Sequence, residues 1–157
     1  MNWIEIIGPT LLVVMGGVLS WSLQNRIQKL NKLNEELRQQ RIAKYASIIN
    51  PLVVIYSRSG GGPEKAGEIL QSVEYRRAAF ELNFWGSNEV VNAYNDLMQF
   101  MYKRDRDGYR TSDTQEMLRL LGTLFLEIRR DVGNSRSKLQ PIDMLRSMIT
   151  DIDQYKN

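Results

Sequence analysis

The beginning of the chain constrains the fold most, because it contains a long run without charge. Residues Ile6 to Leu23 (IIGPTLLVVMGGVLSWSL) carry no charged side chain, although the mean hydropathy of the whole chain is only −0.37. With the residues before it, the run approaches the roughly 20 residues that a helix needs to cross a bilayer. Trp3 and Trp21 would lie about 27 Å apart along such a helix at about 1.5 Å per residue, so each can lie near one membrane interface. We therefore expect a transmembrane anchor over residues 1–23.

The flanking charges predict the orientation of this anchor. No Lys or Arg precedes it, whereas residues 24–44 hold six basic and two acidic residues. Basic flanks of membrane helices stay in the cytoplasm. We therefore expect an N-terminus outside the membrane and a cytoplasmic C-terminal domain, with Arg26, Lys29 and Lys32 beside the lipid headgroups.

Two other interpretations of the uncharged run Ile6 to Leu23 compete with a transmembrane anchor. A cleaved signal peptide begins with basic residues, which are missing here, and a buried helix of a soluble domain would need apolar cover on every face. Within the segment, Gly16 and Ser20 form a small-xxx-small pair at which two membrane helices can approach closely. Contact between two such helices is therefore a further hypothesis.

Residues 24–50 are predicted to form a basic helical stalk that merges into the next domain. A heptad-like seam runs along its first part: Leu23, Ile27, Leu30, Asn34 and Leu37. An Asn at a core position of such a seam can fix the register of a parallel dimer. The favoured interpretation is a single stalk helix that packs on the domain through later apolar residues: Ile42, Tyr45, Ile48 and Ile49. A short dimeric coiled coil is the alternative.

A connector is expected over residues 51–63. Pro51 lacks a backbone donor and should kink or end the stalk helix, and Leu52 to Tyr56 could continue as a helical turn or a short strand. The run Ser57 to Pro63 (SRSGGGP) is rich in glycine, but a phosphate-binding loop would end in Gly-Lys-Ser or Gly-Lys-Thr. We interpret it as a flexible connector.

Residues 64–157 show four helical patterns. The first runs from Ala66 to Trp85, where Gly86 ends it and Ser87 caps the second. The second covers Val90 to Met101 and leads into a polar run, Lys103 to Arg110, read as a solvated loop.

The third and fourth patterns complete the domain. Ser112 with Gln115, or Asp113 with Glu116, offers a capping box for the third, which should end near Gly133. The fourth opens at Pro141, a favourable first-turn residue, and continues to Ile152. With the stalk, this predicts an all-α cytoplasmic bundle of four or five helices.

The chain lacks two residue types, and their absence excludes several kinds of catalytic and metal-binding site. The chain has no Cys and no His, which removes disulfides, thiolate nucleophiles, Cys-based zinc sites and the commonest general base. Glu74 and Glu81 share a helix face, but no nucleophile or metal-ligand spacing accompanies them. Residues 45–157 hold 15 residues of each sign, so no nucleic-acid patch is expected. We expect no catalytic, cofactor-binding or metal-binding residue.

Two motifs carry a resemblance to a bacterial family. The first motif is the junction from Leu82 to Tyr94 (LNFWGSNEVVNAY), with the pattern aromatic-Gly-Ser-x-Glu-Val-x-x-x-Tyr. The second is the segment from Glu127 to Asn134 (EIRRDVGN). They resemble segments of largely uncharacterised small bacterial proteins with one N-terminal membrane helix and a helical cytoplasmic part, some of which lie in mobile or defence-related genetic settings. The resemblance implies the same architecture in a bacterial inner membrane and supplies no catalytic residue.

These observations predict a membrane-tethered interaction or scaffold module that is not an enzyme. Its expected partners are the lipid bilayer and a protein at the membrane, with a homodimer as an option. Arg129 and Arg130 complement the dipole at a helix end, with Asp131 paired locally, or bind an anion or an acidic partner. The alternative function is a membrane-acting effector, such as a small toxin or phage-defence protein, that oligomerises through its transmembrane helix.

Overall fold

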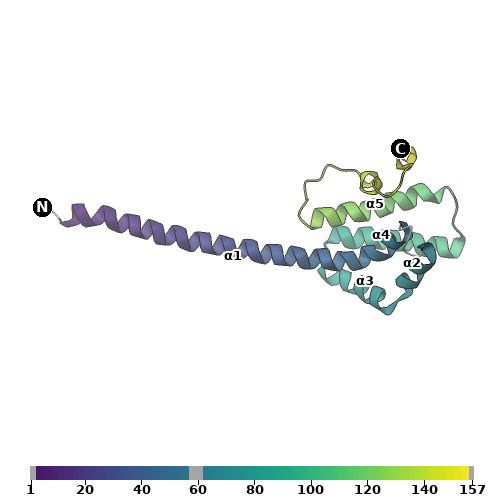
Figure 1. The fold of residues 1–157 in the computed structure, drawn as a ribbon, viewed down its shortest axis with the longest axis horizontal. Helices are drawn as coiled ribbons and strands as arrows, with labels where there is room; N and C mark the ends of the chain where they lie inside the picture. Colours follow the sequence, from purple (N-terminus) through teal and green to yellow (C-terminus); the bar gives the residue numbers. More distant parts are fainter. Residues whose placement is uncertain (1–2, 57–61, 156–157) are drawn as a thin grey trace. The chain divides into compact units, whose positions relative to one another are not determined.

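The computed structural model of the chain is all-helical over the residues that it describes, 3–56 and 62–155, with side chains from Leu23 onward except at positions 55, 56 and 63. Seven helices follow one another: α1 (Trp3–Tyr56), α2 (Gly62–Gln71), α3 (Val73–Trp85), α4 (Asn88–Asp107), α5 (Asp113–Asp131) and two 3₁₀ helices, η1 (Pro141–Leu145) and η2 (Ile152–Tyr155) (Figure 1). The all-α prediction is confirmed. The chain divides into two compact units, residues 1–40 and residues 41–157.

The unit of residues 41–157 is a helical bundle with one apolar core. α4 and α5 lie side by side, and η1 packs on α5 (Figure 1). The largest fully buried side chains come from α1, α3, α4, α5 and η1: Tyr45, Ile48, Pro51, Leu82, Val90, Leu124 and Leu145. The last turns of α1 therefore belong to the same core as the helices that follow.

A close backbone approach holds η1 on α5. A Cβ atom added at Gly122 of α5 would lie 2.2 Å from the carbonyl oxygen of Pro141. Only glycine leaves room for this approach, because real Cβ atoms do not come so near to a backbone oxygen. Gly122 therefore positions the start of η1.

Of the two effects predicted for Pro51, a kink or an end of the helix, the end is wrong. The helix continues to Tyr56, so Leu52–Tyr56 is helical and not a strand. Pro51 is fully buried and Leu52 is buried beside it. Apolar burial of this turn offsets the one backbone hydrogen bond that a proline inside a helix removes. The predicted packing of the stalk is confirmed at Tyr45 and Ile48, which are both 1% exposed.

The first predicted bundle helix is in fact two helices. Ser72 lies between α2 and α3 with an extended backbone, and its Oγ accepts a hydrogen bond from the Tyr75 N–H at 3.1 Å. The apolar spacing runs through this break and conceals it. The next junction is as predicted, since the Gly86 N–H donates to the Leu82 carbonyl and the Ser87 Oγ caps Val90.

Two other predicted boundaries are wrong. α4 continues to Asp107, so most of the polar run from Lys103 is helical. Ser112 makes no capping hydrogen bond; the Asp113 carboxylate instead accepts one from the Arg110 N–H and pairs with Arg104 at 3.3 Å. A charge pair between α4 and α5 therefore replaces the predicted capping box.

The predicted fourth bundle helix is instead the pair η1 and η2. Their apolar side chains recur about every three residues, a spacing that a 3₁₀ turn satisfies as well as an α-helix. Leu145 and Ile152 are buried as the predicted apolar row requires, whereas Met148 of the same row is 41% exposed.

Within the described part of the chain, no helix has both the length and the apolarity to span a membrane. The predicted anchor lies almost wholly among residues 1–22, whose side chains are outside the described residues. Most of the predicted connector, residues 57–61, also lies outside them.

Candidate functional site

An exposed apolar stripe lies on α1 between residues 23 and 37. Its large side chains are all more than half exposed: Leu23 60%, Ile27 55%, Leu30 60%, Leu33 55% and Leu37 54%. Asn34 shares their face and is exposed as well. We call these six residues the stalk stripe. Scattered single apolar residues are ordinary on a protein surface, but a contiguous row of this kind marks a site of interaction.

Polar residues surround the stalk stripe. Arg26, Lys29 and Lys32 are exposed, as a role beside lipid headgroups requires. The Glu35 carboxylate accepts hydrogen bonds from Arg38 at 3.1 Å and Gln39 at 2.8 Å, and these bonds lower the pKa of Glu35. The stripe is therefore apolar along one side of a helix that is otherwise well hydrated.

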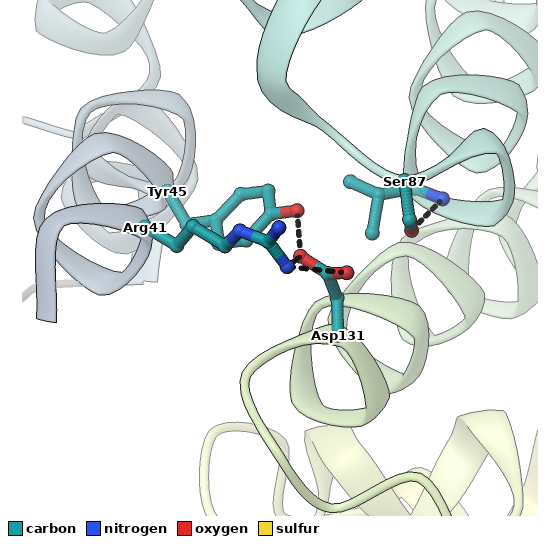
Figure 2. A network of polar contacts seen from close by, with 5 residues as sticks. Arg41, Tyr45, Ser87 and Asp131 are labelled. Carbon is teal, nitrogen blue, oxygen red and sulfur yellow. Dashed lines mark hydrogen bonds and ion pairs between the residues drawn. The ribbon is translucent and has the colours of Figure 1, made fainter. Parts of the chain in front are cut away.

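A polar network joins α1 to the end of α5. Figure 2 shows Arg41 and Tyr45 converging on the carboxylate of Asp131. The Tyr45 hydroxyl donates to Asp131 Oδ2 at 2.6 Å, and Arg41 lies 3.3 Å from Oδ1. A carboxylate in the last turn of a helix opposes the helix dipole. Asp131 is stabilised there by these two donors, so the predicted local pairing is replaced by contacts from α1.

Tyr45 is held at this corner by apolar contacts as well. Its ring meets Trp85 edge to face at a centroid distance of 4.7 Å, and Lys44 lies over the Trp85 ring at 5.4 Å. Burial and the neighbouring Asp131 raise the pKa of Tyr45 far above its usual value, so its hydroxyl remains a donor at neutral pH. The contacts of Tyr45 with Trp85 and Asp131 therefore hold this part of α1 against α3 and α5.

The predicted anion contact at Arg129 and Arg130 lies close to several carboxylates. Arg130 pairs with Glu127 at 2.5 Å, and Arg129 is exposed. A hollow of about 430 Å³ beside Arg130 is lined by three carboxylates: Glu89, Glu127 and Asp131. The field of these carboxylates disfavours an anion at Arg130. Binding of an acidic partner at Arg129 stays a prediction.

A second hollow, of about 630 Å³, lies between α2, α3 and α4. Its walls comprise residues of all three helices: Gly67, Leu70, Gln71, Tyr75, Arg76, Ala79, Tyr94, Met98, Met101, Tyr102 and Asp105. We call it the tyrosine hollow. The hydroxyl oxygens of Tyr75 and Tyr94 lie 3.2 Å apart and share a hydrogen bond. Both side chains are buried, which raises the pKa of each.

Sequence reasoning missed the network and the tyrosine hollow for different reasons. Asp131 lies 86 residues from Tyr45 and 90 from Arg41, and no local pattern joins them. The hollow had a weak signal, because Tyr94, Met98 and Met101 follow helical spacing within the second predicted helix, Val90 to Met101. In the structure this row lines both the core and a cavity.

The remaining candidates lie elsewhere. Trp3, Gly16, Ser20 and Trp21 belong to the residues whose side chains are not described. Among the described side chains, no group of three or more Asp or Glu is arranged to hold a metal ion. Glu81 of the acidic pair considered for acid–base chemistry is bound by Arg77 at 3.0 Å.

Comparison with known proteins adds no identity. No protein-family model, curated protein or solved structure matches this chain.

Proposed function

We propose that this chain is a membrane-tethered helical module, without enzymatic activity, that pairs with a second copy of itself through the stalk stripe and presents its bundle to a protein at the membrane. The observation that carries the proposal is the exposed apolar row on α1, which directly follows the uncharged run Ile6 to Leu23. A helix of this kind gains stability when a partner covers its apolar face.

The residue types in the stalk stripe favour two parallel helices. In a heptad lettered a to g, Ile27 takes position a, and Leu30 and Leu37 take position d. A β-branched residue at a with Leu at d favours a parallel dimer, and one Asn at an a position, here Asn34, specifies register.

The flanking positions are compatible with this arrangement. In a parallel pair, Arg26 at position g faces Asn31 of the other copy, and Leu33 faces Arg38. Neither pair opposes like charges, and the Arg38 stem can cover Leu33. The same register continues toward the N-terminus through Ser20 at a and Gly16 at d, the two small residues considered for helix contact in the membrane.

Tethering supplies the proposed mechanism. An anchor confines the bundle to the membrane surface and raises its effective concentration toward a membrane partner. The basic residues of the stalk, such as Lys29 and Lys32, add attraction to anionic headgroups, about 1 kcal/mol for each cation near the surface. The proposal places the bundle in the cytoplasm, because these cations follow the anchor.

The absence of cysteine permits a clean test in native membranes. Single substitutions Leu23→Cys, Leu30→Cys and Leu37→Cys are made in the full chain, with Lys32→Cys and Gln39→Cys at the outer f positions as matched controls. Mild oxidation should link two copies at all three seam positions and hardly at the controls, because a disulfide requires Cα atoms within about 7 Å.

Other patterns of linkage would contradict the proposal. Equal linkage at seam and control positions would indicate random collision, and linkage at a single seam position would indicate an antiparallel pair. Release of the intact protein from membranes at alkaline pH would contradict the anchor. Loss of membrane potential on expression would favour the effector interpretation.

A further inference from the structure

We propose that the tyrosine hollow binds a small, uncharged aromatic molecule that carries an acceptor oxygen. This site lies wholly within the unit of residues 41–157, and the proposal does not depend on the anchor or on pairing of the stalk.

The size of the hollow suits a small molecule. Its volume of about 630 Å³ falls within the roughly 300–1,000 Å³ that is typical of ligand pockets. Such pockets combine apolar walls with a few converging polar groups. Here Leu70, Ala79 and Met98 are apolar lining residues, and the lining also includes Tyr75 and Tyr94, whose hydroxyls are hydrogen-bonded to each other.

The two buried hydroxyls leave one proton for a ligand. Each tyrosine carries a single O–H, and one hydrogen bond of 3.2 Å joins Tyr75 and Tyr94. One O–H is used in that bond, so the second can donate to an oxygen in the hollow. Tyr75 is 7% exposed and Tyr94 is 8% exposed, and a donor this deep gains most from a ligand acceptor.

The walls favour an aromatic body. Met98 and Met101 place thioether groups along one side, and sulfur makes favourable contacts with ring edges. Tyr102 adds a third aromatic ring to the lining. A planar ring can therefore contact sulfur and aromatic surface while its oxygen reaches the tyrosine pair.

The charges around the hollow favour an uncharged ligand. Arg76 and Asp105 are its charged lining residues among those described, and both are exposed. Their charges are opposite and cancel, so the site gives no net attraction to a cation or an anion.

A probe pair of matched shape tests the inference in the full chain. Acetophenone carries a carbonyl oxygen, and α-methylstyrene replaces that oxygen with a CH₂ group. Gly67→Cys introduces the only thiol of the chain into the wall of the hollow, where a Cβ meets no atom within 4 Å. Glu68→Cys on the exposed face of α2 is the matched control.

Acetophenone should slow maleimide labelling of the Gly67→Cys variant and leave the Glu68→Cys variant unaffected. In the Gly67→Cys background, the double change Tyr75→Phe with Tyr94→Phe removes both hydroxyls without leaving an unpaired partner. The acetophenone concentration that halves labelling should then rise about fivefold, as expected for loss of one neutral hydrogen bond. Protection by α-methylstyrene should not change.

One control variant and two contrary results complete the test of the tyrosine hollow as a binding site. Tyr109→Phe removes an exposed hydroxyl that bonds to Thr114 outside the hollow, and it should leave protection unchanged. No protection of the Gly67→Cys variant by either probe would overturn the site. Protection by acetophenone that is insensitive to the double tyrosine change would overturn the role assigned to the acceptor oxygen.

Discussion

Two segments of α1 carry apolar residues at helical spacing and differ completely in their surroundings. In the stalk stripe, Leu23 and Leu30 are 60% exposed, whereas Tyr45 and Ile48, a few turns later, are 1% exposed. The later segment is covered by helices of its own chain. The earlier one has no such cover among the described residues. Periodicity therefore identifies the face that a helix offers for contact, and it does not say whether the same chain supplies the partner.

The largest expected difference between the two kinds of apolar surface is in stability. Leu124→Ala empties a fully buried position and should lower the free energy of unfolding of the bundle by about 3 kcal/mol. Leu30→Ala should leave it nearly unchanged, because the Leu30 side chain is 60% exposed and its truncation empties no buried position. Urea unfolding in mild detergent, followed by circular dichroism, measures both. An equal loss for the two variants would contradict the distinction between stalk and bundle.

A smaller loss of stability is expected at Gly122, where the backbone of η1 closely approaches α5. Gly122→Ala would force the Pro141 carbonyl away from α5 and should cost about 2 kcal/mol. Amide hydrogen exchange should then increase in η1 and η2 more than in α4. Gly67→Ala is the matched control, because its Cβ meets no atom within 4 Å. Unchanged exchange in η1 would show that this contact does not hold the segment in place.

The contacts of Asp131 with α1 allow the loss of a buried hydrogen bond to be compared with the loss of an exposed ion pair. Asp131→Ala leaves the buried Tyr45 hydroxyl without its acceptor and should lower stability by about 1.5 kcal/mol. Arg41→Ala removes a guanidinium that is 47% exposed and should cost about 0.5 kcal/mol. Thermal unfolding of both variants measures the ratio. A larger effect for Arg41→Ala would mean that the ion pair, rather than the buried hydroxyl, holds the corner.

A dependence of stability on pH is expected from the buried tyrosine Tyr75. Burial raises the pKa of Tyr75 above its usual 10.0 in the folded state, so the unfolded chain loses this proton first as pH rises. The stability from this group is complete below about pH 10 and declines above it. The Tyr75→Phe variant should therefore lose less stability between about pH 9 and pH 11. An identical pH profile in chemical denaturation would contradict this assignment.

Local signals predicted the elements of the bundle better than their ends. The Gly86–Ser87 junction was recognisable because capping depends on neighbouring residues. The break at Ser72 was hidden by apolar residues on both sides of it. The predicted helix end at Pro51 was wrong because the burial of this residue depends on helices that come much later in the chain. The same holds for η1, because its close approach to Gly122 joins residues that are far apart in the sequence.

The functional surfaces were predictable to unequal degrees. The stalk stripe was visible in the sequence, since the seam from Leu23 to Leu37 needs only helical periodicity. The contact of Arg41 and Tyr45 with Asp131 required the folded chain. The tyrosine hollow required the relative positions of three helices, and a cavity has no sequence pattern of its own.

The packing of Trp85 has an optical consequence. The chain has three tryptophans, and the other two, Trp3 and Trp21, lie in the predicted anchor. The Trp85 indole N–H is buried without a hydrogen-bond partner, and its ring contacts Tyr45 and Lys44 of α1. With Trp3 and Trp21 changed to Phe, the remaining fluorescence would come from this one indole. Its emission wavelength and quenching would then report, in living membranes and without any label, whether α1 is docked on the bundle.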